Sequence, residues 1–99
     1  MRMLFIGDPL LVDGYRIAGI DTIAVNSPER LIESLKVSVT KDGLAIILLD
    51  QDYASKVKEE VYNIKLKREL PVIIEVPGRH TAAEVDLKAT VSRIMGVKI

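Results

Sequence analysis

A glycine-containing segment near the N-terminus first suggests a phosphate site. Residues 5–20 read FIGDPLLVDGYRIAGI and follow a short apolar run. The segment contains three glycines: Gly7, Gly14 and Gly19. Their spacing of seven and then five residues fits neither G-x-G-x-x-G nor G-x-x-x-x-G-K-[ST]. Pro9 has no N–H to offer an anion, and Asp8 would repel one at the same place. The segment therefore does not predict a nucleotide site.

A second chemistry would use carboxylates. Asp8 follows the first apolar run, and Asp50 and Asp52 follow a later one, so a parallel sheet would bring them to one edge. Oxygen ligands there could hold Mg²⁺. This pattern is similar to a receiver domain, the phospho-accepting fold of two-component signalling. However, no lysine lies at the end of the last apolar run: PVIIEV continues as PGRH, in which the only side chain of lysine-like charge is Arg79. The favoured alternative is that these acids cap helices, at about 1 kcal/mol each.

The remaining composition excludes several classes of function. The 99 residues include no cysteine and one histidine, His80, which excludes thiolate chemistry and a multi-His metal centre. Lysine plus arginine equals aspartate plus glutamate at 14 each, which gives no electrostatic reason to expect a nucleic-acid partner. Residues 44–49 form the longest apolar run, far below the roughly 20 residues of a membrane span. We therefore expect a cytoplasmic protein with no catalytic residue, cofactor, metal or inserted membrane segment.

Strand and helix patterns alternate along the chain. Strands are predicted at residues 3–6, 21–25, 44–49 and 71–76. Helices are predicted at about residues 9–18, from Pro28 to the Asp42-Gly43 turn, and after Asp50 or Asp52. The third helix would have an apolar stripe of Ala54, Val57, Val61 and Ile64. The order predicts an α/β fold, a Rossmann-like four-stranded parallel sheet with helices on both faces.

A last helix is predicted after a short linker, residues 77–80. Thr81 and Glu84 have the spacing of a capping box, and Gly96 would end the helix. Its apolar stripe consists of Ala83, Leu87, Val91 and Ile94. We therefore divide the chain into an α/β domain, residues 1–78, and a linker with a C-terminal helix, residues 79–99.

Two further residues are considered individually. Gly14 would lie inside the first helix, where glycine costs about 1 kcal/mol relative to alanine. It would permit a close approach either of that helix to the sheet or of a partner to the helix, and the sequence does not choose between them. Glu75 lies late in the last strand and is expected to point outward.

The ordered set of motifs resembles the F subunit of archaeal A-type ATP synthases and V-type ATPases. The similarity begins with Ile6-Gly7-Asp8 and continues with Gly14-Tyr15-Arg16-Ile17-Ala18-Gly19. A Pro-Gly segment follows the last strand, with Pro71, Glu75, Pro77 and Gly78 at the family positions, and the chain closes on Gly96-Val97-Lys98-Ile99. Two departures are the apolar Pro9-Leu10-Leu11, where relatives carry acidic residues, and the short segment after Gly78.

The resemblance implies a role without catalysis of its own. The F subunit belongs to the central-stalk rotor and binds the coiled-coil D subunit, near the A/B catalytic head and the membrane-side C subunit of the stalk. Nucleotide hydrolysis belongs to the A subunits, and proton or sodium transport to membrane subunits. The last helix of the family is described as mobile and as tuning hydrolysis against synthesis. The stripe of Ala83, Leu87, Val91 and Ile94 could then lie on the sheet of the same chain, or serve as a partner surface for the D subunit or the head, on a protein peripheral to the membrane.

Overall fold

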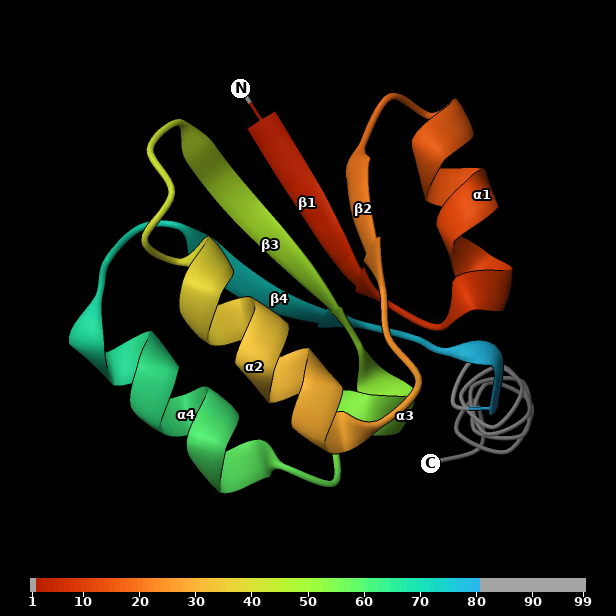
Figure 1. The fold of residues 1–99 in the computed structure, drawn as a ribbon. Helices are drawn as coiled ribbons and strands as arrows, with labels where there is room; N and C mark the ends of the chain where they lie inside the picture. Colours follow the sequence, from red (N-terminus) through yellow and green to blue (C-terminus); the bar gives the residue numbers. More distant parts are fainter. Residues whose placement is uncertain (1, 81–99) are drawn as a thin grey trace, which may run out of the picture.

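The computed structural model describes residues 2–80, which form a four-stranded sheet with helices packed against it (Figure 1). The elements are β1 (Arg2–Gly7), α1 (Pro9–Ile17), β2 (Asp21–Ala24), α2 (Pro28–Ser38), β3 (Leu44–Asp50), α3 (Gln51–Ala54), α4 (Lys58–Lys67) and β4 (Val72–Val76). The predicted order of four strands with intervening helices is confirmed.

All strand pairs are parallel, and the strand order in the sheet is β2-β1-β3-β4. Strand β2 lies on one side of β1. The chain then crosses to the other side of β1, where β3 and β4 follow in order. The reversal lies between β1 and β3, whose ends are adjacent because Ile6 is paired with Leu49. In open α/β sheets this topological switch point is where ligands commonly bind. The predicted α/β class and parallel sheet are confirmed.

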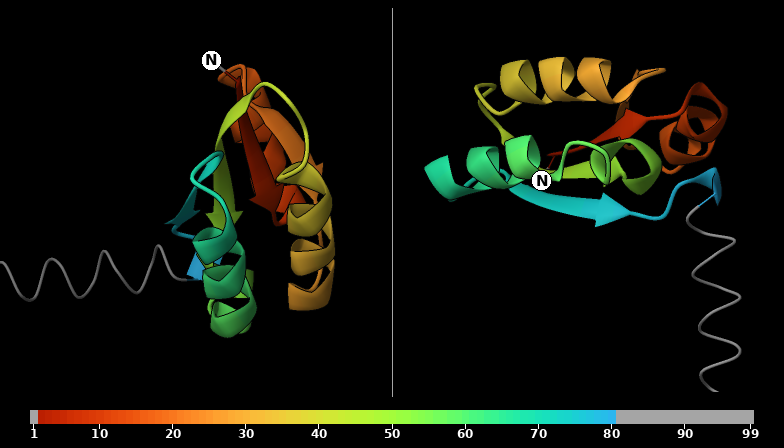
Figure 2. Two further views of the ribbon diagram at one scale, coloured as in Figure 1. Left: turned by 90° about the vertical axis from the view of Figure 1, so that its left-hand side faces the viewer. Right: turned by 90° about the horizontal axis from the view of Figure 1, so that it is seen from below.

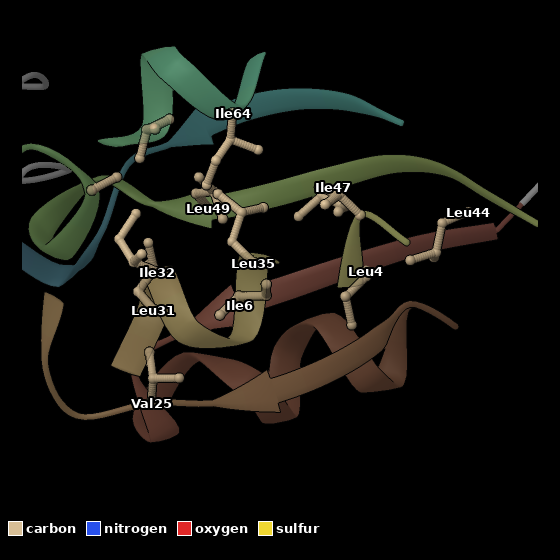
Figure 3. Packing of buried hydrophobic residues seen from close by; sticks show 13 residues of the cluster. Leu4, Ile6, Val25, Leu31, Ile32, Leu35, Leu44, Ile47, Leu49 and Ile64 are labelled. Atoms are coloured by element: carbon tan, nitrogen blue, oxygen red, sulfur yellow. The ribbon is translucent and has the colours of Figure 1, made fainter. Parts of the chain in front are cut away.

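One face of the sheet is covered by α2 and α4, which lie side by side (Figure 2). Leu31 and Leu35 of α2 and Val61 of α4 are buried there against Ile6, Ile47 and Leu49 of the central strands (Figure 3). These are the inward positions of amphipathic helices over a parallel sheet.

The opposite face is covered over its β1 side by α1. Val12 of α1 packs against Phe5 and Leu48, and the Tyr15 ring stacks on Phe5 with centroids 4.0 Å apart. On the β4 side of the same face, Val72 and Ile74 remain 45% and 43% exposed. Within residues 2–80, α1 is the helix that contributes to the apolar cluster of this face, so an apolar strip of β4 remains open.

Helix ends follow the predicted local signals. Asp8 caps α1 ahead of Pro9, and Gly19, with φ +86°, lies just beyond its end. The Ser27 hydroxyl accepts the N–H of Arg30 at 3.1 Å and so caps α2. This helix ends at Ser38, earlier than the predicted Asp42-Gly43 stop.

The prediction of one helix after the third strand is wrong. The segment forms two helices, α3 and α4, separated by Ser55, Lys56 and Val57, with Val57 outside the helical region at φ −133° and ψ 40°. The break lets α3 pack at the end of β3 while α4 runs back beside α2, which one straight helix could not do. Ala54, Val61 and Ile64 of the predicted stripe are nevertheless all buried, and Val57 packs against the same core.

Candidate functional site at the carboxyl edge of the sheet

The three predicted carboxylates meet at the switch point. Asp8 directly follows β1, Asp50 is the last residue of β3, and Asp52 lies in α3. The backbone N–H of Asp8 donates a hydrogen bond to Oδ2 of Asp50 at 2.9 Å. The prediction that these acids lie at one edge of the sheet is therefore confirmed, and a hydrogen bond links Asp8 to Asp50.

Asp8 and Asp50 both act as helix caps. Oδ1 of Asp8 accepts the N–H of Leu10 at 2.8 Å, and Oδ1 of Asp50 accepts the N–H of Asp52 at 3.0 Å. Of the two residues considered for the second cap, Asp50 holds the position. It is completely buried, and each of its oxygens accepts a backbone N–H. The capping interpretation is confirmed for both residues.

The segment after β4 fills the space around these acids. Nε of Arg79 lies 2.7 Å from Oδ2 of Asp8, and the backbone N–H of His80 donates to Oδ2 of Asp52 at 3.1 Å. Gly78 is buried against Asp50 and Asp52, and a Cβ placed on it would overlap both side chains. The chain itself therefore occupies the place where a ligand would approach.

Sequence reasoning missed this role of Arg79. From the sequence, Arg79 is noted only as a residue near the place where a receiver domain has its lysine. It lies 71 residues after Asp8 in the chain. The information needed is the register of β4, which the sequence pattern does not report: β4 pairs with β3 so that Val76 lies opposite Asp50. Residues that follow β4 must then emerge beside Asp50, and the first basic residue among them is Arg79.

The pKa values of Asp8 and Asp50 are shifted in opposite directions. The N–H of Leu10 and, after it, the Arg79 guanidinium keep the pKa of Asp8 below its ordinary value, against the effect of burial. Burial raises the pKa of Asp50, although the N–H groups of Asp8 and Asp52 oppose this. Burial also raises the pKa of the nearby Tyr53. Of the two capping acids, Asp8 is the one whose charge is favoured by a cationic side chain.

This arrangement does not favour the receiver-like hypothesis. In residues 2–80, no group of three or more acidic or histidine side chains is arranged to hold a metal ion. Asp50, the acid at the end of the central strand, is out of reach of solvent, and Asp8 is paired with Arg79. Both acids work as structural groups that fix the starts of helices.

The other predicted residues have separate roles. Glu75 lies opposite Leu49 on the sheet face that α4 covers, and its partly exposed carboxylate pairs with Nζ of Lys65 of α4 at 2.9 Å, so the expected outward direction is not what the structure shows. Pro71 is buried just before β4, and Pro77 is exposed. The residues of the C-terminal stripe, together with Gly96, lie outside the described part of the chain: Ala83, Leu87, Val91 and Ile94.

One explanation of Gly14 is wrong. The residue is exposed on α1, and a Cβ built on it would meet no neighbouring atom within 4 Å. Close packing of this helix on the sheet therefore does not require glycine there. The alternative of a partner that approaches the helix remains.

The start of the last helix also differs from the prediction. Arg79 and His80 are already helical, two residues before the predicted cap at Thr81. The Asp52 carboxylate accepts the N–H of His80 at this first turn, so the α/β domain supplies an acceptor to the helix start. The predicted cap residues, Thr81 and Glu84, lie outside the described part of the chain.

Comparison with known proteins agrees with the sequence motifs. The family described as ATP synthase (F/14-kDa) subunit matches residues 3–94. This chain belongs to that ATP synthase family. The A-type ATP synthase F subunit of Methanococcus maripaludis is 30% identical over 103 residues, which cover 100% of this chain and 99% of that protein. The F subunit of Thermococcus gammatolerans is 30% identical over 106 residues, at 100% and 98% coverage.

A solved member of the F-subunit family has the same fold. The crystal structure of the V-type ATP synthase F subunit from Archaeoglobus fulgidus superposes with a TM-score of 0.62 at 26% identity. The match covers 76% of this chain and 95% of that one. Within residues 2–80, no helix has both the length and the apolar character needed to cross a lipid bilayer. The chain is therefore a member of the A/V-type ATP synthase F-subunit family with the parallel α/β fold expected for it.

Two glycine substitutions should change stability in opposite directions. A Cβ on Gly7 would lie 2.5 Å from both Cβ of Asp50 and Cζ of Phe5, so Gly7→Ala should lower the free energy of unfolding by about 1–3 kcal/mol. Gly14→Ala should raise it by roughly 0.4–1 kcal/mol, because the site is open and helical. Urea denaturation measures both. A neutral Gly7→Ala or a destabilising Gly14→Ala would contradict this account.

The Asp8 charge should make part of the stability pH-dependent. Its pKa is lower in the folded than in the unfolded chain, so its contribution is complete above the unfolded-state pKa and is lost as pH falls through the folded-state pKa. An asparagine side chain at this position would keep the cap and lose the charge. The difference in unfolding free energy between wild type and Asp8→Asn should therefore be constant above about pH 5 and shrink below it.

Urea titrations of both proteins at several pH values test this expectation. The raised pKa of Asp50 acts in the opposite direction but is common to both proteins, so it largely cancels in the difference. A difference that stays constant, or grows, on acidification would rule out a stabilising Asp8 charge.

Proposed function

We propose that this protein is a non-catalytic subunit of the central stalk of an A/V-type ATP synthase. In this role it binds the D subunit and turns with it, next to the A/B head and the C subunit, and it modulates ATP hydrolysis against synthesis. The observation that carries the proposal is the family match across residues 3–94, together with full-length relatives that are themselves named as F subunits.

The carboxyl edge supports a role without chemistry of its own. Its acids are used as caps and as partners of Arg79 and His80, and the segment after β4 lies over them. The chain has no phosphate-binding glycine motif. ATP chemistry would then belong to other subunits of the complex, and this chain would act through its surfaces.

The outer surface of α1 is our proposed contact for the D subunit. Leu10, Gly14 and Ile17 lie at positions i, i+4 and i+7, which share one face of a helix. Leu10 is 71% and Ile17 87% exposed, and Gly14 between them leaves open space. A helix of a coiled coil can approach closely at such a glycine, which would offset the helix-weakening cost of Gly14.

The proposed role predicts a stable complex with the D subunit. Co-expression of the tagged chain with the D subunit of the same organism should give one gel-filtration peak that contains both proteins. Gly14→Leu and Ile17→Glu should each reduce the amount of the D subunit recovered. Leu66→Glu serves as a control, since Leu66 is also apolar and 67% exposed but lies on α4.

Three results would count against parts of this proposal. No recovery of the D subunit with the wild-type chain would contradict the stalk role. Equal loss of this partner with Leu66→Glu would contradict the α1 contact. Labelling of an aspartate by acetyl phosphate with Mg²⁺ would favour the receiver-like function, and we expect no label.

For the C-terminal segment we propose exchange between a docked and an extended position. A docked position is supported by the open apolar strip of β4, where Val72 and Ile74 are nearly half exposed. The sequence stripe of Ala83, Leu87, Val91 and Ile94 would supply the complementary apolar surface. A segment that leaves this strip could reach the head of the complex, which is a two-state element of the hinge type.

Amide hydrogen exchange in the isolated protein tests this exchange of positions. The amides of residues 87–95 should exchange much faster than those of β3, and Ile74→Asp should accelerate them further by weakening the docked position. Leu66→Asp, at an exposed apolar residue of α4, should not. Protection of residues 87–95 as strong and uniform as that of β3 would rule out the proposed exchange.

A further inference from the structure

The three residues after Pro77 are each held by a carboxylate of the switch point. Gly78 packs on Asp50 and Asp52, Arg79 pairs with Asp8, and His80 donates its N–H to Asp52. Asp8 follows β1, Asp50 ends β3 and Asp52 lies in α3, and the held segment follows β4. Figure 1 shows the end of the described chain passing the place where α1 and α3 begin.

The two sides of the Asp8–Arg79 contact are unequal. The Asp8 side chain is only 8% exposed and is fixed in place by its bond to the Leu10 N–H, while the main-chain N–H of Asp8 is bound to Asp50. The Arg79 side chain is 44% exposed, so water and ions compete for it. The Asp8 carboxylate is therefore held in place, whereas the Arg79 side chain can move away into solvent. Such a contact can form and break reversibly.

We propose that residues 78–80 form a latch that sets the direction in which the chain leaves the domain after residue 80. With Arg79 on Asp8 and His80 on Asp52, residues 79 and 80 have a fixed orientation relative to the sheet. Loss of the Arg79 contact removes one of these two attachments, so the orientation of residues 79 and 80 is no longer fixed. The consequence for ATPase regulation rests on the proposed function, but the latch itself is a property of the free chain.

Gly78 is the residue that makes the latch possible. Any side chain at this position would overlap the Asp50 and Asp52 carboxylates and lift the segment from the edge. The latch therefore has three parts with separate substitutions: a glycine that allows contact, a buried acid that receives, and an exposed arginine that can leave.

Pulsed electron paramagnetic resonance on the full chain tests the latch. Because the sequence has no cysteine, Lys36→Cys and His80→Cys place two spin labels, one on α2 and one at the end of the latch, and the contact of residue 80 with Asp52 is made by its backbone N–H. The latched chain should give one dominant distance. Arg79→Gln and Asp8→Asn should each cause the loss of that distance to a similar extent. The double variant should add nothing further, because both substitutions remove the same contact.

Two controls complete the design. Arg30→Gln, at an exposed arginine of α2, should leave the distance distribution unchanged. Salt raised from about 0.1 M to about 1 M, which shortens the Debye length from about 10 Å to about 3 Å, should shift the wild type toward the Arg79→Gln distribution. It should have no effect on Arg79→Gln itself.

The latch is overturned if Arg79→Gln keeps the wild-type distance distribution, if Arg30→Gln changes it equally, or if salt has no effect on the wild type. If the Arg79→Gln variant does not fold, the salt series on the wild-type chain still tests whether the latch exists. None of these measurements involves the D subunit, so failure of the latch and failure of the stalk role give different results.

Discussion

The buried carboxylate of Asp50 is the group on which the arrangement of the carboxyl edge depends. It ends the central strand β3, is removed from water, and accepts the N–H groups of Asp8 and Asp52. A buried carboxylate without such donors would cost several kcal/mol, so the two N–H groups must stay in place for the charge to be tolerated. One side chain thereby fixes the starts of α1 and α3 relative to each other.

The glycines around Asp50 follow from the same constraint. Gly7 and Gly78 both lie against its side chain, at positions where a Cβ would collide. Gly19 has a different reason, a positive φ just after α1. Gly14 has neither a positive φ nor a close neighbour within the described residues. Glycines of one family motif thus meet two separate physical requirements, close packing and a positive φ, and Gly14 meets neither of them.

Local features of this structure were predictable from sequence, and long-range ones were not. The caps at Asp8 and Ser27 and the apolar strands depend on neighbours within a few residues, so their patterns gave the element order and the parallel sheet. The break at Val57 depends on packing at the end of β3, which periodicity does not describe. The Asp8–Arg79 pair depends on the strand order β2-β1-β3-β4 and the register of β4, which no local pattern reports.

The acidic edge also shows why a cluster of carboxylates predicted from sequence need not be a ligand site. A cation that approached Asp8 would have to displace Arg79, which belongs to the same chain and is therefore present at a high effective concentration. A phosphoryl donor would meet an Asp50 that is buried and whose two oxygens each already accept a backbone N–H. The switch point of the sheet keeps its geometry, but its ligand is the segment that follows β4. In the latch that we propose, the edge that elsewhere binds a nucleotide instead holds residues 78–80 of the same chain.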